Sequence, residues 1–202
     1  MSEPNAAWAP KFPDRLRLPL RFDAALLAKD LLAARPEDWI AHFVPQNYVG
    51  DWSVLPLRAK AGATHPIMMI YSDPLCRSFA DTPFLAAFPH CKSVMASFAC
   101  PLLAVRLMRL GPGAAIKEHR DYDLDAENGV ARLHVPILTS SDVTFALNGR
   151  PVPMEAGSCW YLRLSDPHAV DNRGTRERVH LVLDVEVDGW LEALFAAATQ
   201  EA

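Results

Sequence analysis

The chain has 202 residues, of which 50% are hydrophobic, and its formal net charge is −4 at pH 7. This length fits one domain, and the hydrophobic content supplies a sizeable core, so the composition excludes wholesale disorder. No basic stripe occurs, which argues against nucleic acid as a partner. No charged-then-apolar start and no apolar run of bilayer length occurs, so we expect no membrane association and a cytoplasmic location. The cysteines form no C-x-x-C pair and indicate free thiols: Cys76, Cys91, Cys100 and Cys159.

The first half of the chain predicts helices and short strands. Residues 1–14 contain three prolines and no periodicity, and we expect a flexible tail there. Asp23 is placed to cap an alanine- and leucine-rich helix over residues 24–34. Residues 51–58 alternate in part and predict a strand, and the short apolar run at 66–71 predicts another.

The second half of the chain consists of short β-type runs separated by polar turns. Asn148-Gly149 is a strong hairpin signal, and Asp188 is placed to cap a C-terminal helix. Several short strands at close spacing indicate a barrel or a jelly-roll sandwich. We therefore expect one mainly β domain over residues 1–202, with N-terminal helices, a β core over 102–187 and a C-terminal helix over 188–202.

The strongest chemical signal is an imidazole and a carboxylate two residues apart, His119 and Asp121. On an extended segment these two side chains point to the same face and are able to hold one metal ion together. His168, which follows Asp166-Pro167, offers a third ligand. Two histidines and one carboxylate on a β-scaffold form the ligand set of non-haem Fe(II) oxygenases, which leaves metal positions open for substrate and dioxygen.

Two predicted strands carry an arginine and a histidine at the same spacing, Arg132 with His134 and Arg178 with His180. Each pair shares one face by period two, and the opposite face is aliphatic. For one strand alone, a solvated polar face is the simpler interpretation. Two such strands close to the expected ligands indicate a cationic pocket instead. Arginine suits bidentate recognition of a carboxylate, so a dicarboxylate that chelates the metal and reaches Arg178 fits this pattern.

The sequence resembles the bacterial aspartyl/asparaginyl β-hydroxylase-type proteins. These are similar to the cis-proline hydroxylases within the 2-oxoglutarate- and Fe(II)-dependent dioxygenases. The resemblance is densest from about Leu102 to Trp190. It is carried by the H-x-D at His119 and Asp121, Arg132-Leu133-His134, Trp160-Tyr161, His168 with Asn172, and Arg178-Val179-His180-Leu181.

This resemblance implies a double-stranded β-helix of the jelly-roll or cupin-like kind. It implies that His119, Asp121 and His168 hold Fe(II). It further implies that Arg178 binds the far carboxylate of the cosubstrate 2-oxoglutarate, with Arg132 and His134 near its metal-bound end. The implied reaction uses dioxygen to hydroxylate an unactivated C–H bond of an amino acid or amino-acid-like moiety, free or within a peptide or other larger molecule.

Two other classes of function use the same residues. A cupin-like Zn(II) or Mn(II) hydrolase or isomerase has the same ligands but no need of the arginines, and a non-catalytic small-molecule-binding barrel has no need of all three ligands. The oligomeric state stays open between a monomer and a homodimer. The last predicted helix either covers the barrel or meets a second subunit through Trp190, Leu194 and Phe195. We assign no role to His42, His65 and His90.

Overall fold

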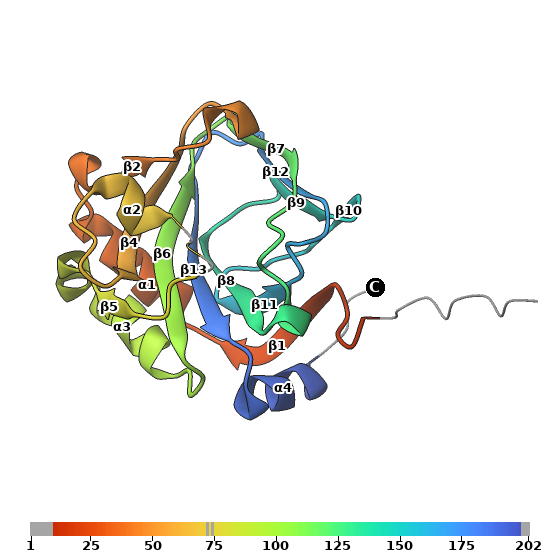
Figure 1. Ribbon diagram of the computed structural model, residues 1–202. Helices are drawn as coiled ribbons and strands as arrows, with labels where there is room; N and C mark the ends of the chain where they lie inside the picture. Colours follow the sequence, from red (N-terminus) through yellow and green to blue (C-terminus); the bar gives the residue numbers. More distant parts are fainter. Residues whose placement is uncertain (1–9, 72, 74, 199–202) are drawn as a thin grey trace, which may run out of the picture.

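Two antiparallel sheets form the body of the protein (Figure 1). The computed structural model of the chain describes residues 10–71, 73 and 75–198. Among them, an eight-stranded sheet has the order β1-β11-β8-β13-β6-β4-β2, with β5 paired to β4, and a five-stranded sheet has the order β10-β9-β12-β7-β3. Two facing sheets of this kind confirm the predicted mainly β, jelly-roll class of fold.

The strands have the following bounds. The larger sheet contains β1 (Arg15–Arg21), β2 (Ile40–Ala41), β4 (Trp52–Lys60), β5 (Phe79–Asp81), β6 (Leu102–Leu110), β8 (Val130–Leu138), β11 (Ser158–Leu162) and β13 (Arg178–Glu186). The smaller sheet contains β3 (Tyr48–Val49), β7 (Ala115–His119), β9 (Val143–Leu147), β10 (Arg150–Pro151) and β12 (His168–Asn172). Short 3-10 segments occupy η1 (Leu31–Ala33), η2 (Pro36–Asp38), η3 (Pro45–Asn47), η4 (Pro83–Ala87) and η5 (Ala126–Asn128).

The two faces of the larger sheet differ because alternate residues of a strand point to opposite sides. One face of β8 and β13 presents aliphatic side chains such as Leu133 and Leu181, which belong to the main hydrophobic core. Three helices add residues to that core: α1 (Ala24–Asp30), α3 (Pro89–Ala96) and α4 (Gly189–Ala196). The other face carries the buried polar side chains of Arg132, His134, His180 and Asp184. The site is therefore built on this polar face.

Caps and turns agree with the sequence at three places. Asp23 accepts hydrogen bonds from the amides of the first turn of α1, and Asp188 accepts one from the Leu191 amide at the start of α4. Asn148 and Gly149 have φ angles of 52° and 70°, as the tight turn between β9 and β10 requires. The four cysteines are buried and free, as predicted.

One predicted strand is wrong. The run at 66–71 forms the helix α2 (Pro66–Ile70), and Pro66 suits the first position of a helix because its missing N–H needs no partner there. Ile70 is 4% exposed and packs with Val54 and Met108 of the larger sheet. A short apolar run shows no decisive period, so its sequence pattern alone does not distinguish a helix from a strand.

Both ends of the described chain pack against the larger sheet. The expected flexible tail covered residues 1–14, of which residues 1–9 lie outside the described residues. From Phe12 onward the chain is docked, because the Phe12 ring meets Phe195 edge-on at 5.1 Å and its amide donates to Glu127. Phe195 also contacts Tyr161 of β11, so α4 packs against the larger sheet of the same chain. In the described part of the chain, no helix combines the length and the hydropathy needed to cross a bilayer.

Candidate metal centre

The three predicted ligands come together at one end of the smaller sheet. His119 is the last residue of β7, and His168 is the first residue of the antiparallel neighbour β12, directly opposite it. Asp121 lies just beyond the end of β7, where its amide donates to the Leu164 carbonyl at 2.8 Å. One ligand atom from each of the three side chains lies within 4.8 Å of the others.

Backbone carbonyls orient both imidazoles. Nδ1 of His119 lies 2.8 Å from the Lys117 carbonyl oxygen, and Nδ1 of His168 lies 3.0 Å from that of Asp166. A carbonyl only accepts, so each Nδ1 carries the hydrogen and each Nε2 keeps its lone pair for a metal. Burial lowers the pKa of His168 to about 4, which keeps this imidazole neutral, the form that binds metals.

The two carboxylate oxygens of Asp121 make different contacts. Its Oδ1 lies 3.8 Å from His119 Nε2, and its Oδ2 accepts a hydrogen bond of 3.0 Å from Arg132 Nη1. Oδ1 is therefore the oxygen that faces the histidines. Two imidazoles and one carboxylate oxygen suit Fe(II) and leave coordination positions open, so the residues present fit the metal.

A buried chain of charges extends from Asp121 into the larger sheet. Arg132 donates through Nε and Nη2 to the two oxygens of Asp184, at 2.6 and 3.0 Å. Arg106 donates to the same carboxylate at 2.6 Å and to the Ile70 carbonyl at 3.2 Å. Burial alone would raise the pKa of Asp184, but the charges of Arg132 and Arg106 hold that pKa below its usual value. Sequence reasoning missed Asp184, although it shares the polar face of its strand with His180.

A second polar cluster joins β13 to β8. Nη2 of Arg178 donates to Nδ1 of His180 at 2.7 Å, and this atom lies 3.4 Å from Nδ1 of His134. Because His180 Nδ1 accepts, its Nε2 carries the hydrogen. Nε of Arg178 and Nε2 of both histidines are buried and have no hydrogen-bond partner within the described residues. Burial without a neutralising carboxylate lowers the pKa of Arg178 to about 9. The orphaned N–H groups of Arg178 and His180 suit an incoming anion.

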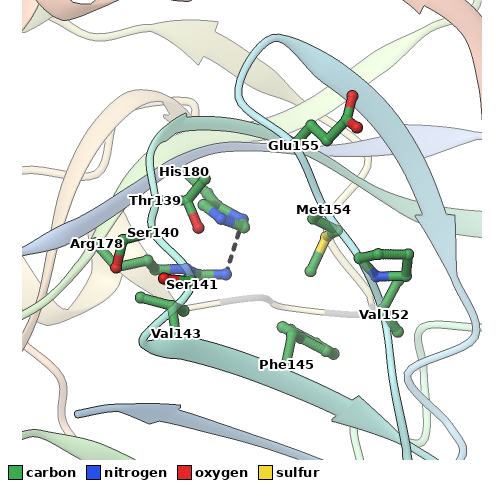
Figure 2. A pocket seen from close by; sticks show the side chains of 11 residues that line it. Thr139, Ser140, Ser141, Val143, Phe145, Val152, Met154, Glu155, Arg178 and His180 are labelled. Atoms are coloured by element: carbon green, nitrogen blue, oxygen red, sulfur yellow. Dashed lines mark hydrogen bonds between the residues drawn. The ribbon is translucent and has the colours of Figure 1, made fainter. Parts of the chain in front are cut away.

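This cluster borders a cavity of about 330 Å³ (Figure 2). In Figure 2 the hydrogen-bonded Arg178 and His180 lie on one side of the cavity, and Phe145 lies opposite them. Phe145 also stacks on His168, with the rings 3° from parallel and their centroids 6.0 Å apart. One ring, Phe145, therefore both lines the cavity and contacts His168. Its remaining lining comes from Thr139, Ser140, Ser141, Val143, Val152, Pro153, Met154 and Glu155.

A larger cavity of about 640 Å³ reaches the ligands from another side. His119, Asp121 and Arg132 line it, and they share it with His42 and Trp52. The rings of His42 and Trp52 stack at 3.5 Å, and burial lowers the pKa of His42 to about 4. The indole Nε1 of Trp52 is buried and has no partner among the described residues.

His42 had no predicted role, and local sequence carries no signal for it. The pairing of β2 with β4 brings it to the site, since the His42 amide donates to the Trp52 carbonyl just beyond the paired residues. All six residues proposed from the sequence lie in this region. The structure brings His119, Asp121 and His168 together, links Arg178 to His134 through His180, and joins Arg132 to Asp121 and Asp184.

Comparisons with known proteins identify the family of this chain. A model of the aspartyl/asparaginyl beta-hydroxylase family matches residues 24–187. The chain is 24% identical over 184 residues to an L-proline cis-4-hydroxylase of Rhizobium meliloti (strain 1021), a match that covers 90% of this chain but only 64% of the relative's length. A solved prolyl-4-hydroxylase from Pseudomonas putida has a similar fold, with a TM-score of 0.50 and 13% identity over 87% of this chain and 94% of that one. The chain belongs to the aspartyl/asparaginyl beta-hydroxylase family.

Proposed function

We propose that the protein is a 2-oxoglutarate- and Fe(II)-dependent dioxygenase that hydroxylates an unactivated C–H bond of an amino acid or amino-acid-like moiety. The observation that carries the proposal is the position of Arg178, a buried and unneutralised guanidinium, beside a cluster of two histidines and one carboxylate. Family membership and the relative that is named a proline hydroxylase support it.

The roles of the ligands follow from their orientation. Nε2 of His119, Nε2 of His168 and Oδ1 of Asp121 would hold the iron, because their other polar atoms already have partners. When bound, the iron supplies dioxygen activation coupled to the oxidative decarboxylation of 2-oxoglutarate to succinate and CO2. The backbone carbonyls behind the two imidazoles keep the ligands in place during turnover.

Arg178 and His180 would bind the far carboxylate of the cosubstrate. Their orphaned N–H groups, Nε of Arg178 and Nε2 of His180, supply donors, and the guanidinium supplies the charge that a dianion needs in a buried site. Phe145, Val152 and Met154 line the same cavity and keep it dry. His134 would line the path between this carboxylate and the metal.

Arg132 has a different place in the proposal from the one that the family resemblance implied. Its guanidinium spans Asp121 and Asp184, so we assign it to the support of the metal ligand.

The substrate would occupy the larger cavity beside His42 and Trp52. A Zn(II) or Mn(II) hydrolase or isomerase leaves the orphaned donors of Arg178 and His180 without a use, and a non-catalytic binding barrel has no need of all three ligands. The cytoplasmic location and a homodimer stay predictions.

Anaerobic spectroscopy tests the proposal. Fe(II) and 2-oxoglutarate added to the apoprotein should produce the weak visible charge-transfer band of the chelate. Asp121→Ala should abolish the band, while Arg176→Ala, which changes an exposed arginine two residues from Arg178, should retain it. The absence of a band from the wild-type protein would refute the proposed site. Succinate formation, screened across free amino acids and small peptides, would then identify the substrate.

A further inference from the structure

Asp184 lies at the centre of the buried charge network behind the metal ligands. It is 3% exposed on β13 and stands directly across from Arg132 in the pairing of β13 with β8. The strand register therefore determines which arginine it meets. Arg132 presents Nε and Nη2 to the two carboxylate oxygens, and such two-point contact fixes both the position and the plane of a guanidinium.

The remaining terminal nitrogen of Arg132 reaches the metal centre. With Nε and Nη2 held by Asp184, Nη1 is directed at Oδ2 of Asp121 and donates to it at 3.0 Å. This contact leaves Oδ1 as the oxygen nearest His119. Asp184 fixes the orientation of the Arg132 guanidinium. This guanidinium in turn determines whether Asp121 offers the metal one oxygen or two.

Arg106 fixes Asp184 from the other side. It donates to Oδ2 of Asp184 at 2.6 Å and to the carbonyl of Ile70, the last residue of α2. A network of two buried arginines and one buried carboxylate needs every member, because the loss of one charge leaves the others uncompensated. Without the charge of Asp184, the cation of Arg132 would compete with the metal for Asp121.

We propose that Asp184 is a positioning residue of the metal centre, which acts through Arg132 to hold Oδ2 of Asp121 and so presents Oδ1 alone to the metal. The inference rests on the metal centre proposed above. It predicts that the loss of the Asp184 charge changes metal affinity and ligand geometry even in the absence of cosubstrate and substrate.

Co(II) is a suitable probe because its visible d–d absorption reports ligand number and geometry. Asp184→Asn in the full-length protein should weaken Co(II) binding by about tenfold or more, the scale of effects seen when groups behind metal ligands are removed. It should also alter the Co(II) spectrum. Asp30→Asn is the matched control, since Asp30 is another 3% exposed carboxylate and accepts from the Cys91 amide far from the ligands in sequence. This control should bind Co(II) with the wild-type affinity and spectrum.

A double variant tests whether Asp184 acts through Arg132. In Arg132→Met protein, the further change Asp184→Asn should reduce Co(II) affinity far less than it does alone, because residues that act as a unit are not additive. Full additivity would show that Asp184 acts by another route and would overturn the inference.

The outcomes separate the two proposals. If the wild-type protein binds no Co(II), the metal centre is refuted, and the role of Asp184 falls with it. If the wild-type protein binds Co(II) and folded Asp184→Asn protein has the same affinity and spectrum, only the role of Asp184 is refuted. Should Asp184→Asn fail to fold, Asp184→Glu keeps the charge but displaces it by one methylene. An unchanged Co(II) spectrum in that variant would likewise overturn the inference.

Discussion

His119 and His168 face each other in direct register across β7 and β12, and their ring centroids lie 4.2 Å apart. Because backbone hydrogen bonds set the distance between paired strands, the two imidazoles need little further support to stay close. Asp121 lies beyond the strand end and has no such constraint, which is why a side chain from the other sheet, Arg132, holds it.

Replacement of Arg178 by methionine should weaken cosubstrate binding without lowering the stability of the apoprotein. The change removes a buried and unneutralised charge, so the thermal midpoint of the apoprotein should stay the same or rise. Affinity for 2-oxoglutarate should fall by roughly 1.5–3 kcal/mol, the usual contribution of a hydrogen bond to a charged group. Calorimetric titration and thermal unfolding measure both effects. Arg176→Met is the control, and equal losses of affinity in the two variants would contradict the assignment.

Phe145→Ala should destabilise the protein because it opens a cavity beside a metal ligand. Phe145 is 5% exposed and supports the ring of His168. Removal of a buried phenylalanine side chain costs about 3–5 kcal/mol in free energy of unfolding. Phe145→Leu should cost less than Phe145→Ala, since it fills most of the space. Urea unfolding of the apoprotein gives both values, and a loss below roughly 1 kcal/mol for the alanine variant would show that the site collapses around the gap.

The free energy of unfolding should depend on pH through His42. Burial lowers the pKa of His42 from 6.5 to about 4 in the folded protein, so the unfolded chain binds the proton first. The contribution of His42 to stability is therefore largest above pH 6.5 and is lost as the pH drops toward 4. His42→Phe keeps an aromatic ring and should show a smaller loss over this range, as chemical denaturation at several pH values would reveal. An equal loss in both proteins would contradict the prediction, and exposed His65→Phe serves as the control.

Gly157→Ala should destabilise the start of β11. At Gly157 the φ angle is +78°, and an added Cβ would come within 2.2 Å of the Phe22 carbonyl oxygen, a backbone atom that cannot easily move. Gly113 has a similar φ of +66° but open space around it. Gly113→Ala should therefore cost about 1 kcal/mol from backbone strain, and Gly157→Ala clearly more. Thermal unfolding compares the two, and equal midpoints would show that backbone shifts relieve the contact.

Periodicity predicted the parts of the site that depend on a single strand. The alternation of Arg132 and His134 with aliphatic neighbours indicated which face of β8 would be polar, and the same held for Arg178 and His180 on β13. The strand β1 carries an equally clear alternation, with leucines at 16, 18 and 20. No element is predicted there, although Pro19 fits the edge position that β1 occupies.

Contacts between distant strands could not be predicted in this way. Asp184 meets Arg132 across 52 positions of sequence, and His42 reaches the site through the two-residue strand β2. His42 has no local pattern that distinguishes it from a loop histidine, and the period-two pattern that places Asp184 on the polar face of its strand does not indicate its partner. The register of paired strands supplies this information, and it depends on the packing of the whole domain.

Oxygen transfer tests the central claim most directly. The protein would be supplied with Fe(II), 2-oxoglutarate and 18O2, and the succinate formed would be analysed by mass spectrometry, with and without amino-acid substrates. A 2-oxoglutarate-dependent dioxygenase places one 18O atom in each succinate, and Asp121→Ala should abolish this product. The absence of labelled succinate from metal-loaded wild-type protein, or equal succinate from the wild type and Asp121→Ala, would contradict the account.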